Sequence, residues 1–155
     1  MREIFLSYIL PCVWAMVACV GFGLIFNIQG MGVLITGLGG ALGWMVYLIM
    51  MALQDSDILA AFVAAMSIAV YSELMARVRR CPVTGYLQIA LLPLVPGAGV
   101  YRAMRYCVEG DTERFTTTLL HTIGFAAALS VGAMLASSLF RALLPRFPRK
   151  KTDRP

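Results

Sequence analysis

Five long apolar runs, joined by short polar connections, constrain this chain more than any other feature of its sequence. Their limits are residues 4–26, 31–53, 57–76, 83–105 and 115–144. An α-helix needs about 20 apolar residues to cross a bilayer, and a backbone in hydrocarbon must satisfy its own hydrogen bonds. The sequence therefore predicts an all-α polytopic membrane protein with about five transmembrane helices.

The composition indicates the same class. Of 155 residues, 60% are hydrophobic and only 14% are charged, whereas soluble domains average about 45–50% apolar and about 25% charged residues. The mean hydropathy is +0.81. We expect a single transmembrane domain, residues 1–144, followed by a basic tail, residues 145–155, with no room for a soluble catalytic module.

The net charge of +5 does not indicate nucleic-acid binding, because six of the thirteen Lys and Arg residues lie in the last fifteen positions. Arg77, Arg79 and Arg80 are typical contacts for lipid phosphates. In a five-span protein they lie on the same side of the membrane as the six tail residues, so that this side is the more basic one. Basic residues accumulate on the cytoplasmic side of membrane proteins. We therefore expect a multi-pass protein of the bacterial inner membrane, with its N-terminus outside and its C-terminus inside. The lipid bilayer is an expected partner and nucleic acid is not.

The first run has some features of a cleaved leader. Arg2 precedes it, and Val17-Ala18-Cys19 resembles a lipoprotein cleavage site. Since its apolar residues continue to Phe26 and further runs follow, we expect it to be retained as a helix. Asn27 then predicts a left-handed helix cap.

The fourth run contains the stretch LLPLVPGAGVYRAM, residues 91–104, whose prolines and glycines are unfavourable inside a helix. Pro93 has no N–H for the carbonyl of Ile89, and Pro96 has none for the carbonyl of Leu92. Unpaired backbone groups are costly in hydrocarbon, so this stretch must face protein or water. The sequence predicts that the fourth helix is broken at its Pro-x-x-Pro-Gly motif.

A half-helix that begins near Pro96 would expose its first N–H groups. Free N–H groups and the helix dipole favour an anion, as at the discontinuous helices of secondary transporters. An ordinary proline kink, satisfied by neighbouring helices, is the alternative explanation. The substrate-binding residues that we predict are Gln88, Pro93, Pro96, Gly97, Ala98, Gly99, Tyr101 and Arg102.

Two ionisable residues inside the runs, Glu73 and His121, are candidates for ion coupling. Acids inside membranes often carry protons or cations, and histidine changes charge near neutral pH. Each also has a structural explanation. Glu73 precedes Arg77 at the spacing of a helix ion pair, and a lone histidine often makes an ordinary helix contact.

Small residues form rows along two of the runs, and such rows let another backbone approach closely. The row residues are Gly39 and Gly43 in the second run, and Gly124, Ala128, Gly132 and Ala136 in the fifth. They must meet helices of the same chain or of another subunit. Because five short spans enclose little volume, we expect further subunits in a homo-oligomer or hetero-oligomer.

No metal, cofactor or enzymatic site is expected. The cysteines Cys12, Cys19, Cys81 and Cys107 lack a C-x-x-C spacing and a histidine cluster, so we interpret them as apolar fillers. The sequence contains no nucleophile paired with a base and no phosphate-binding loop.

The order of these motifs resembles that of the threonine/serine exporter family. The resemblance lies in Gly21-Phe22 with Phe26-Asn27, Ser72-Glu73-x-x-Ala76-Arg77 with Arg80-Cys81-Pro82, Leu92-Pro93-Leu94-Val95-Pro96-Gly97, and Tyr101-Arg102-Ala103-Met104. More closely, the chain resembles the small membrane subunit of the family's two-component form, which is associated with export of succinate and related dicarboxylates. The resemblance implies a larger membrane partner with a hydrophilic N-terminal region and about five spans of its own.

We therefore expect a subunit of a secondary transporter that exports small carboxylate-bearing metabolites, either a dicarboxylate such as succinate or threonine and serine. Alternating access, driven by the proton gradient, is the expected mechanism. A helix N-terminus near Arg102 and Arg105 suits the carboxylate of either substrate class. Two alternatives stay open: a non-transporting assembly or lipid-interacting subunit, which needs no site, and a small pore, which needs no broken span.

Overall fold

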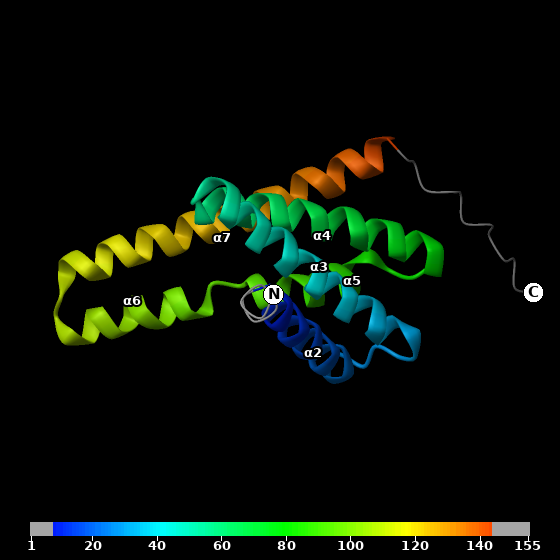
Figure 1. Ribbon diagram of the computed structural model, residues 1–155, viewed down its shortest axis with the longest axis horizontal. Helices are drawn as coiled ribbons and strands as arrows, with labels where there is room; N and C mark the ends of the chain where they lie inside the picture. The colour runs from blue at the N-terminus through cyan, green and yellow to red at the C-terminus, as the bar shows by residue number, and fades with distance from the viewer. Residues whose placement is uncertain (1–7, 144–155) are drawn as a thin grey trace, which may run out of the picture.

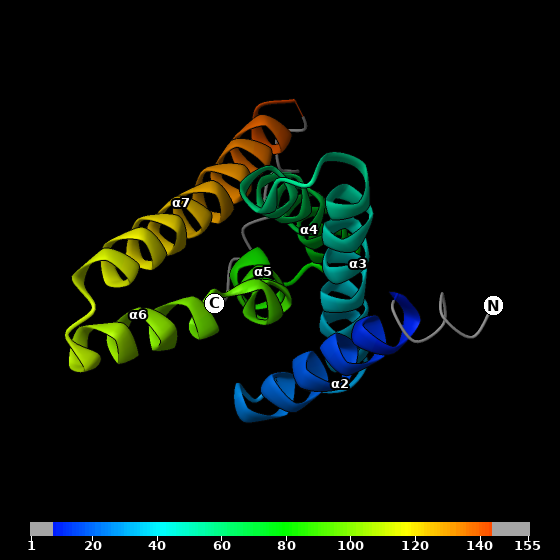
Figure 2. The ribbon, with the colours of Figure 1, turned by 60° about the vertical axis from the view of Figure 1, so that its left-hand side comes forward.

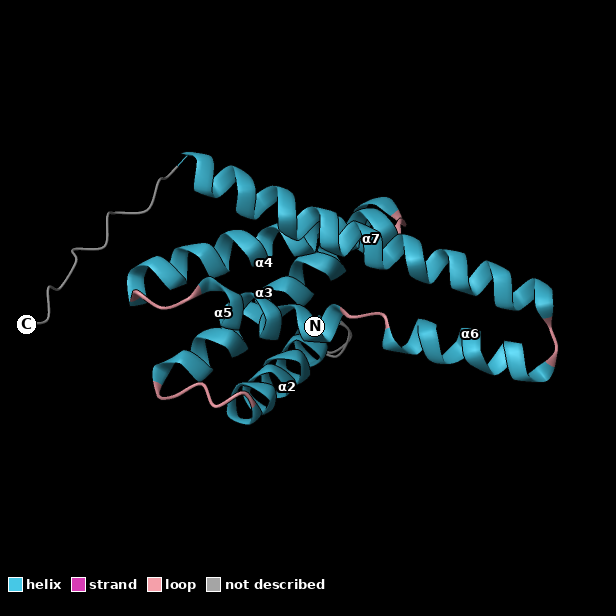
Figure 3. Cartoon of the chain, turned by 180° about the vertical axis from the view of Figure 1, so that it is seen from behind, coloured by secondary structure: helices cyan, strands magenta, loops and turns pink. Residues whose placement is uncertain are grey.

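The computed structural model describes residues 8–143, and this part of the chain is helical with short turns and no strand (Figures 1 and 3). Its elements are α2 (Leu10–Ile25), α3 (Met31–Gln54), α4 (Asp57–Arg79), α5 (Val83–Leu91), the 3-10 turn η2 (Leu92–Leu94), α6 (Gly97–Glu109) and α7 (Thr112–Leu143). These limits lie within a few residues of the predicted runs, except that the fourth run is divided. The beginning of the first run and the predicted basic tail lie outside the described residues.

Three helices are long and apolar enough to cross a membrane: α3, α4 and α7, with 24, 23 and 32 residues. The α5–η2 segment and α6 pass the same test only as a pair, with a bend of 50° between them. This geometry fits one broken span or a re-entrant loop. α2 has 16 residues, about 24 Å at 1.5 Å per residue, against a hydrocarbon core of about 30 Å. The described chain thus contains three to four candidate spans, and a total of five stays a prediction.

The helix ends follow from local backbone chemistry. Each of α2, α3, α4 and α6 is followed by a residue in the left-handed conformation: Asn27, Asp55, Arg80 and Gly110. After α2, the N–H of Ile28 donates to the carbonyl of Gly23 at 2.9 Å, which is the long-range hydrogen bond of a Schellman cap. The predicted cap at Asn27 is confirmed.

α4 lies at the centre of the bundle, between α3 and α7 and beside α5 (Figure 2). Its inward positions are small, and most are completely buried: Ala60, Ala61, Ala64, Ala65, Ala69 and Ala76. Small side chains let neighbouring helix backbones approach closely, which is how membrane helices gain packing energy without a hydrophobic driving force. α2 packs on the side of α3 away from α7.

The small-residue row of α3 is covered by α4. A Cβ added at Gly39 would come within 2.9 Å of the Tyr71 ring, and one at Gly43 would overlap the side chain of Ile68. Both glycines are buried. This row therefore closes the α3–α4 interface of the same chain.

The row of α7 also meets α4. A Cβ added at Gly132 would lie 2.6 Å from the carbonyl oxygen of Phe62, and Gly124 has a looser contact at 3.3 Å. Ala136 is buried and Ala128 is half-buried. Both rows therefore meet helices of the same chain, which is one of the two alternatives that the sequence left open, and the expected further subunits stay a prediction.

α6 and the first part of α7 form a hairpin that projects beyond the α3–α4 turn (Figure 1). The 32 residues of α7 extend for about 48 Å, so roughly a third of this helix exceeds the length that a span requires. Ion pairs flank the hairpin turn: Arg105 with Glu109 at 2.8 Å and Arg114 with Asp111 at 3.3 Å. These charges indicate that the tip of the hairpin lies in water.

Candidate functional site

Local hydrogen bonds satisfy part of the backbone at the break between α5 and α6. The carbonyl of Ile89 has no N–H donor at Pro93, and it accepts from the N–H of Leu92 instead. The carbonyl of Leu92 in turn accepts from the N–H of Val95 at 3.2 Å. The chain thus tightens into a 3-10 turn before α6 starts.

The start of α6 leaves two backbone donors available. The N–H of Gly97 donates to the carbonyl of Val95 at 2.8 Å, and the N–H of Val100 donates to the carbonyl of Pro96 at 3.1 Å. The N–H groups of Ala98 and Gly99 have no partner among residues 8–143. Two of the three donors predicted from sequence are therefore free to meet a ligand.

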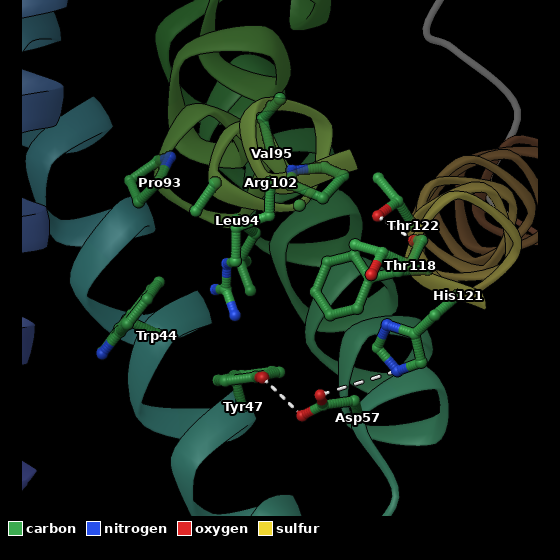
Figure 4. Close-up of a pocket in the computed structure, with 14 residues that line it drawn as sticks. Trp44, Tyr47, Asp57, Pro93, Leu94, Val95, Arg102, Thr118, His121 and Thr122 are labelled. Atoms are coloured by element: carbon green, nitrogen blue, oxygen red, sulfur yellow. Dashed lines mark hydrogen bonds and ion pairs between the residues drawn. The ribbon is translucent and has the colours of Figure 1, made fainter. Parts of the chain in front are cut away.

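A pocket of about 390 Å³ lies beside this break (Figure 4). Side chains from α3, α4, η2, α6 and α7 surround it: Trp44, Tyr47, Asp57, Pro93, Leu94, Val95, Pro96, Ala98, Gly99, Arg102, Thr118, His121, Thr122 and Phe125. The volume is within the range of small-molecule sites, which are mostly apolar with a few convergent polar groups.

The first residue of α4 gives the pocket an acidic end. The hydroxyl of Tyr47 donates to Oδ1 of Asp57 at 2.9 Å, and Nε2 of His121 lies 3.8 Å from Oδ2 of the same carboxylate. Figure 4 shows the three side chains converging from three different helices. Protonation of His121 would turn this contact into an ion pair.

Arg102 gives the pocket a positive charge. Its side chain extends from α6 into the pocket (Figure 4), and it forms no ion pair with any residue that the structure describes. Arg105, one turn further along α6, is instead engaged by Glu109 and lies outside the pocket lining. The free N–H groups at the start of α6, which also lies at the pocket, add to its positive character.

Aromatic and hydroxyl side chains form the remaining walls. Tyr47 and Phe125 pack edge to face, with ring centroids 6.2 Å apart. The hydroxyl of Thr122 donates to the carbonyl of Thr118 at 2.7 Å and keeps its oxygen lone pairs available. The pocket therefore combines unlike charges with an apolar wall and a hydroxyl.

The predicted site residues separate into two groups. Those that line the pocket are Pro93, Pro96, Ala98, Gly99, Arg102 and His121. Those outside it are Gln88, Gly97 and Tyr101; Gln88 is exposed on α5 and Tyr101 is 70% exposed. His121, which was predicted for ion coupling, therefore lines the same pocket as residues that were predicted to bind the substrate.

Glu73 lies at the other end of α4, about 24 Å from Asp57 at 1.5 Å per residue. It is only 2% exposed, and it accepts a hydrogen bond from Nε of Arg141 at 2.9 Å. Arg77, its expected partner, stacks its guanidinium on the ring of Phe140 at 4.7 Å. The two residues proposed together for ion coupling are thus at opposite ends of the α4–α7 pair.

The acidic group of the pocket, Asp57, was not among the residues predicted from the sequence. Asp57 begins a helix, where an acid is usually explained by the helix dipole. Tyr47 was the available signal, because it places a hydroxyl inside an otherwise apolar stretch and a buried hydroxyl needs a partner. Among the described residues, no group of three or more His, Cys, Asp or Glu side chains is arranged to hold a metal ion.

A family model described as threonine/serine exporter, ThrE, matches residues 11–139. No curated protein and no solved structure matches the chain. The matched range includes the break and every residue that lines the pocket.

Proposed function

The chain belongs to the threonine/serine exporter family, and on this premise we propose that it is a subunit of a secondary transporter that exports a small carboxylate-bearing metabolite through the pocket beside the break. One observation carries the proposal. Arg102, which has no ion-pair partner in the described chain, extends into the same pocket as the carboxylate of Asp57. Family membership also makes a transporter the expected class rather than an enzyme.

Charge complementarity favours an amino-acid zwitterion as the substrate. Its carboxylate fits Arg102 and the free N–H groups of Ala98 and Gly99, and its ammonium group fits Asp57. The hydroxyl of threonine or serine then has Thr118 and Thr122 on the adjacent wall. Binding both charged groups at once would distinguish these amino acids from simple carboxylic acids and amines.

A dicarboxylate such as succinate is the second candidate, and the contact of His121 with Asp57 supports it. The second carboxylate of a dicarboxylate would be repelled by an ionised Asp57. A protonated His121 would offset that negative charge and so reduce the repulsion. Succinate transport would therefore depend on His121 more strongly than amino-acid transport does.

We propose alternating access as the mechanism, with α5, η2 and α6 acting as a single broken span and His121 as the group that takes up the coupling proton. The charged and titratable groups that face His121 are Asp57 from α4, Tyr47 from α3 and Arg102 from α6. With the N-terminus outside and the C-terminus inside, the pocket lies near the α3–α4 turn on the outer side. The two-component form, with a larger membrane partner, belongs to this proposal.

Transport by proteoliposomes that contain the chain, with and without its larger partner, tests the proposal. We expect Arg102→Gln to raise the KM for threonine about 10-fold to 100-fold, the range for a lost charged hydrogen bond. Arg105→Gln is the matched control, since Arg105 lies on the same helix outside the pocket. Asp57→Asn should weaken threonine transport and leave succinate transport equal or better.

Two results would overturn the proposal. An unchanged KM in Arg102→Gln for both substrates would remove the pocket as the substrate site. Full transport by the partner without this chain would support the assembly or lipid-interacting subunit instead, and leakage of an unrelated dye would indicate a pore.

A further inference from the structure

Cys19 in α2 makes a hydrogen bond at the break from far away in the sequence. Its Sγ donates to the carbonyl oxygen of Ile89 at 3.3 Å, across 70 residues, and the side chain is completely buried. This carbonyl is the one that Pro93 leaves without its regular helix donor. We infer that Cys19 is a positioning residue, which holds the broken helix in the shape that the pocket requires.

The surroundings of Cys19 are built to fit the thiol. A Cβ added at Gly40 of α3 would overlap Sγ of Cys19, so only a glycine at that position leaves room for the sulfur. α2, α3 and α5 thus meet at one thiol, which donates to a carbonyl that also accepts from the N–H of Leu92 but lacks its regular helix donor at Pro93. A residue that merely fills space has no need of a polar atom at this point.

The position of Ile89 affects the pocket directly, because the residues that follow it line the pocket. Pro93 follows one turn later and lines the pocket beside Trp44. Leu94 is buried and approaches α3 near Gly43. A shift of the α5 end therefore moves η2 and the start of α6, which carry the free N–H groups and Arg102.

Three substitutions separate the hydrogen bond from simple packing. Cys19→Ser keeps a donor, Cys19→Ala removes it, and Cys19→Val keeps the apolar volume without a donor. Cys12→Ala is the matched control, because Cys12 is buried in the same helix and its thiol donates no hydrogen bond to a described residue. Gly40→Ala displaces the thiol without changing Cys19 itself.

Fluorescence of Trp44 reports the shape of the break without any transport assay. The chain has two tryptophans, so a Trp14→Phe background leaves Trp44 as the single emitter. We expect Cys19→Ala, Cys19→Val and Gly40→Ala to give a red shift and greater acrylamide quenching in the purified protein. Cys19→Ser and Cys12→Ala should leave the spectrum unchanged.

The transport measurements on the Cys19 variants rest on the proposed function. In proteoliposomes with the partner, Cys19→Ala and Cys19→Val should raise the KM for threonine or succinate about twofold to tenfold, with an unchanged maximal rate and rescue by Cys19→Ser. The inference would be overturned if Cys19→Val kept the KM and the Trp44 spectrum of the natural protein while Cys19→Ser changed both as Cys19→Ala does. That result would show that Cys19 only fills space. A changed Trp44 spectrum with no transport of either substrate in any variant would instead reject the proposed function and leave the positioning role in place.

Discussion

Two glycines at the start of α6 have very different surroundings. A Cβ added at Gly97 meets no other heavy atom within 4 Å, whereas one at Gly99 would lie 2.6 Å from Oγ1 of Thr122. Thr122 is buried, and its hydroxyl is engaged by the carbonyl of Thr118, so this side chain cannot easily rotate away. Because Gly99 has no Cβ, α6 can pack closely against α7 beside the pocket.

We predict that Gly99→Ala destabilises the protein by about 1–3 kcal/mol, the usual range for overpacking, and raises the KM for threonine. Gly97→Ala should leave both quantities nearly unchanged or slightly increase stability, because alanine has less backbone entropy to lose on folding. Thermal unfolding in detergent and transport kinetics measure the two effects. Shortening the obstructing side chain, as in Gly99→Ala with Thr122→Ala, should recover stability; no recovery would mean that the strain arises elsewhere.

At the level of helices, α4 and α7 are joined at both ends by polar contacts and in between by small residues. Near the start of α4 the contact is Asp57 with His121, and toward its end the contact is Glu73 with Arg141. Between them, alanines of α4 pack against the small-residue row of α7 at Gly132.

The two partners of the Glu73–Arg141 ion pair are unequally buried, because the Glu73 side chain is 2% exposed and that of Arg141 is 60% exposed. Arg141→Gln would leave a buried carboxylate without its guanidinium, so we expect a loss of about 3 kcal/mol. Glu73→Gln leaves an arginine that water can solvate, so its loss should be clearly smaller, and the double variant should resemble Glu73→Gln. These losses are measured by thermal or denaturant unfolding.

A different result would assign Glu73 to transport. If Glu73→Gln keeps normal stability but changes the pH dependence of export, then the ion-coupling role proposed from sequence is correct for this residue. Equal losses in the two single variants would contradict the unequal burial on which the stability prediction rests.

At the scale of the whole molecule, two natural cysteines lie at positions that report the topology. Cys81, after α4, and Cys107, near the end of α6, are exposed, whereas Cys12 and Cys19 are buried. If α5 and α6 form one broken span with the N-terminus outside, then Cys107 faces the outside and Cys81 the cytoplasm. Arg79 and Arg80 beside Cys81 agree with a cytoplasmic position.

We predict that a membrane-impermeant maleimide labels Cys107 in intact cells and labels Cys81 only after permeabilisation. Cys81→Ser and Cys107→Ser variants identify each signal. The reversed pattern would contradict the proposed orientation. Labelling of both cysteines from one side would show that α5 and α6 form a re-entrant loop.

The sequence alone determined the all-helical membrane class, the limits of the helices and the position of the break. These properties depend on local rules: a bilayer requires apolar runs of a certain length, and a proline has no N–H to donate. The N-terminus of α6 and Arg102 were predicted as binding groups for a similarly local reason. The free N–H groups follow the break directly along the chain, and Arg102 lies about one turn further.

Only the tertiary structure decided which side chains meet. Asp57 with His121, Glu73 with Arg141 and Cys19 with Ile89 all lie on different helices, and their contact depends on the rotation and vertical offset of those helices. α4 and α7 are apolar around most of their circumference, so periodicity gives no inward face from which to predict a pairing. The offset is set by glycines that fit individual side chains, such as Gly40 at Cys19 and Gly132 at Phe62, and that three-dimensional fit is not contained in any single run of residues.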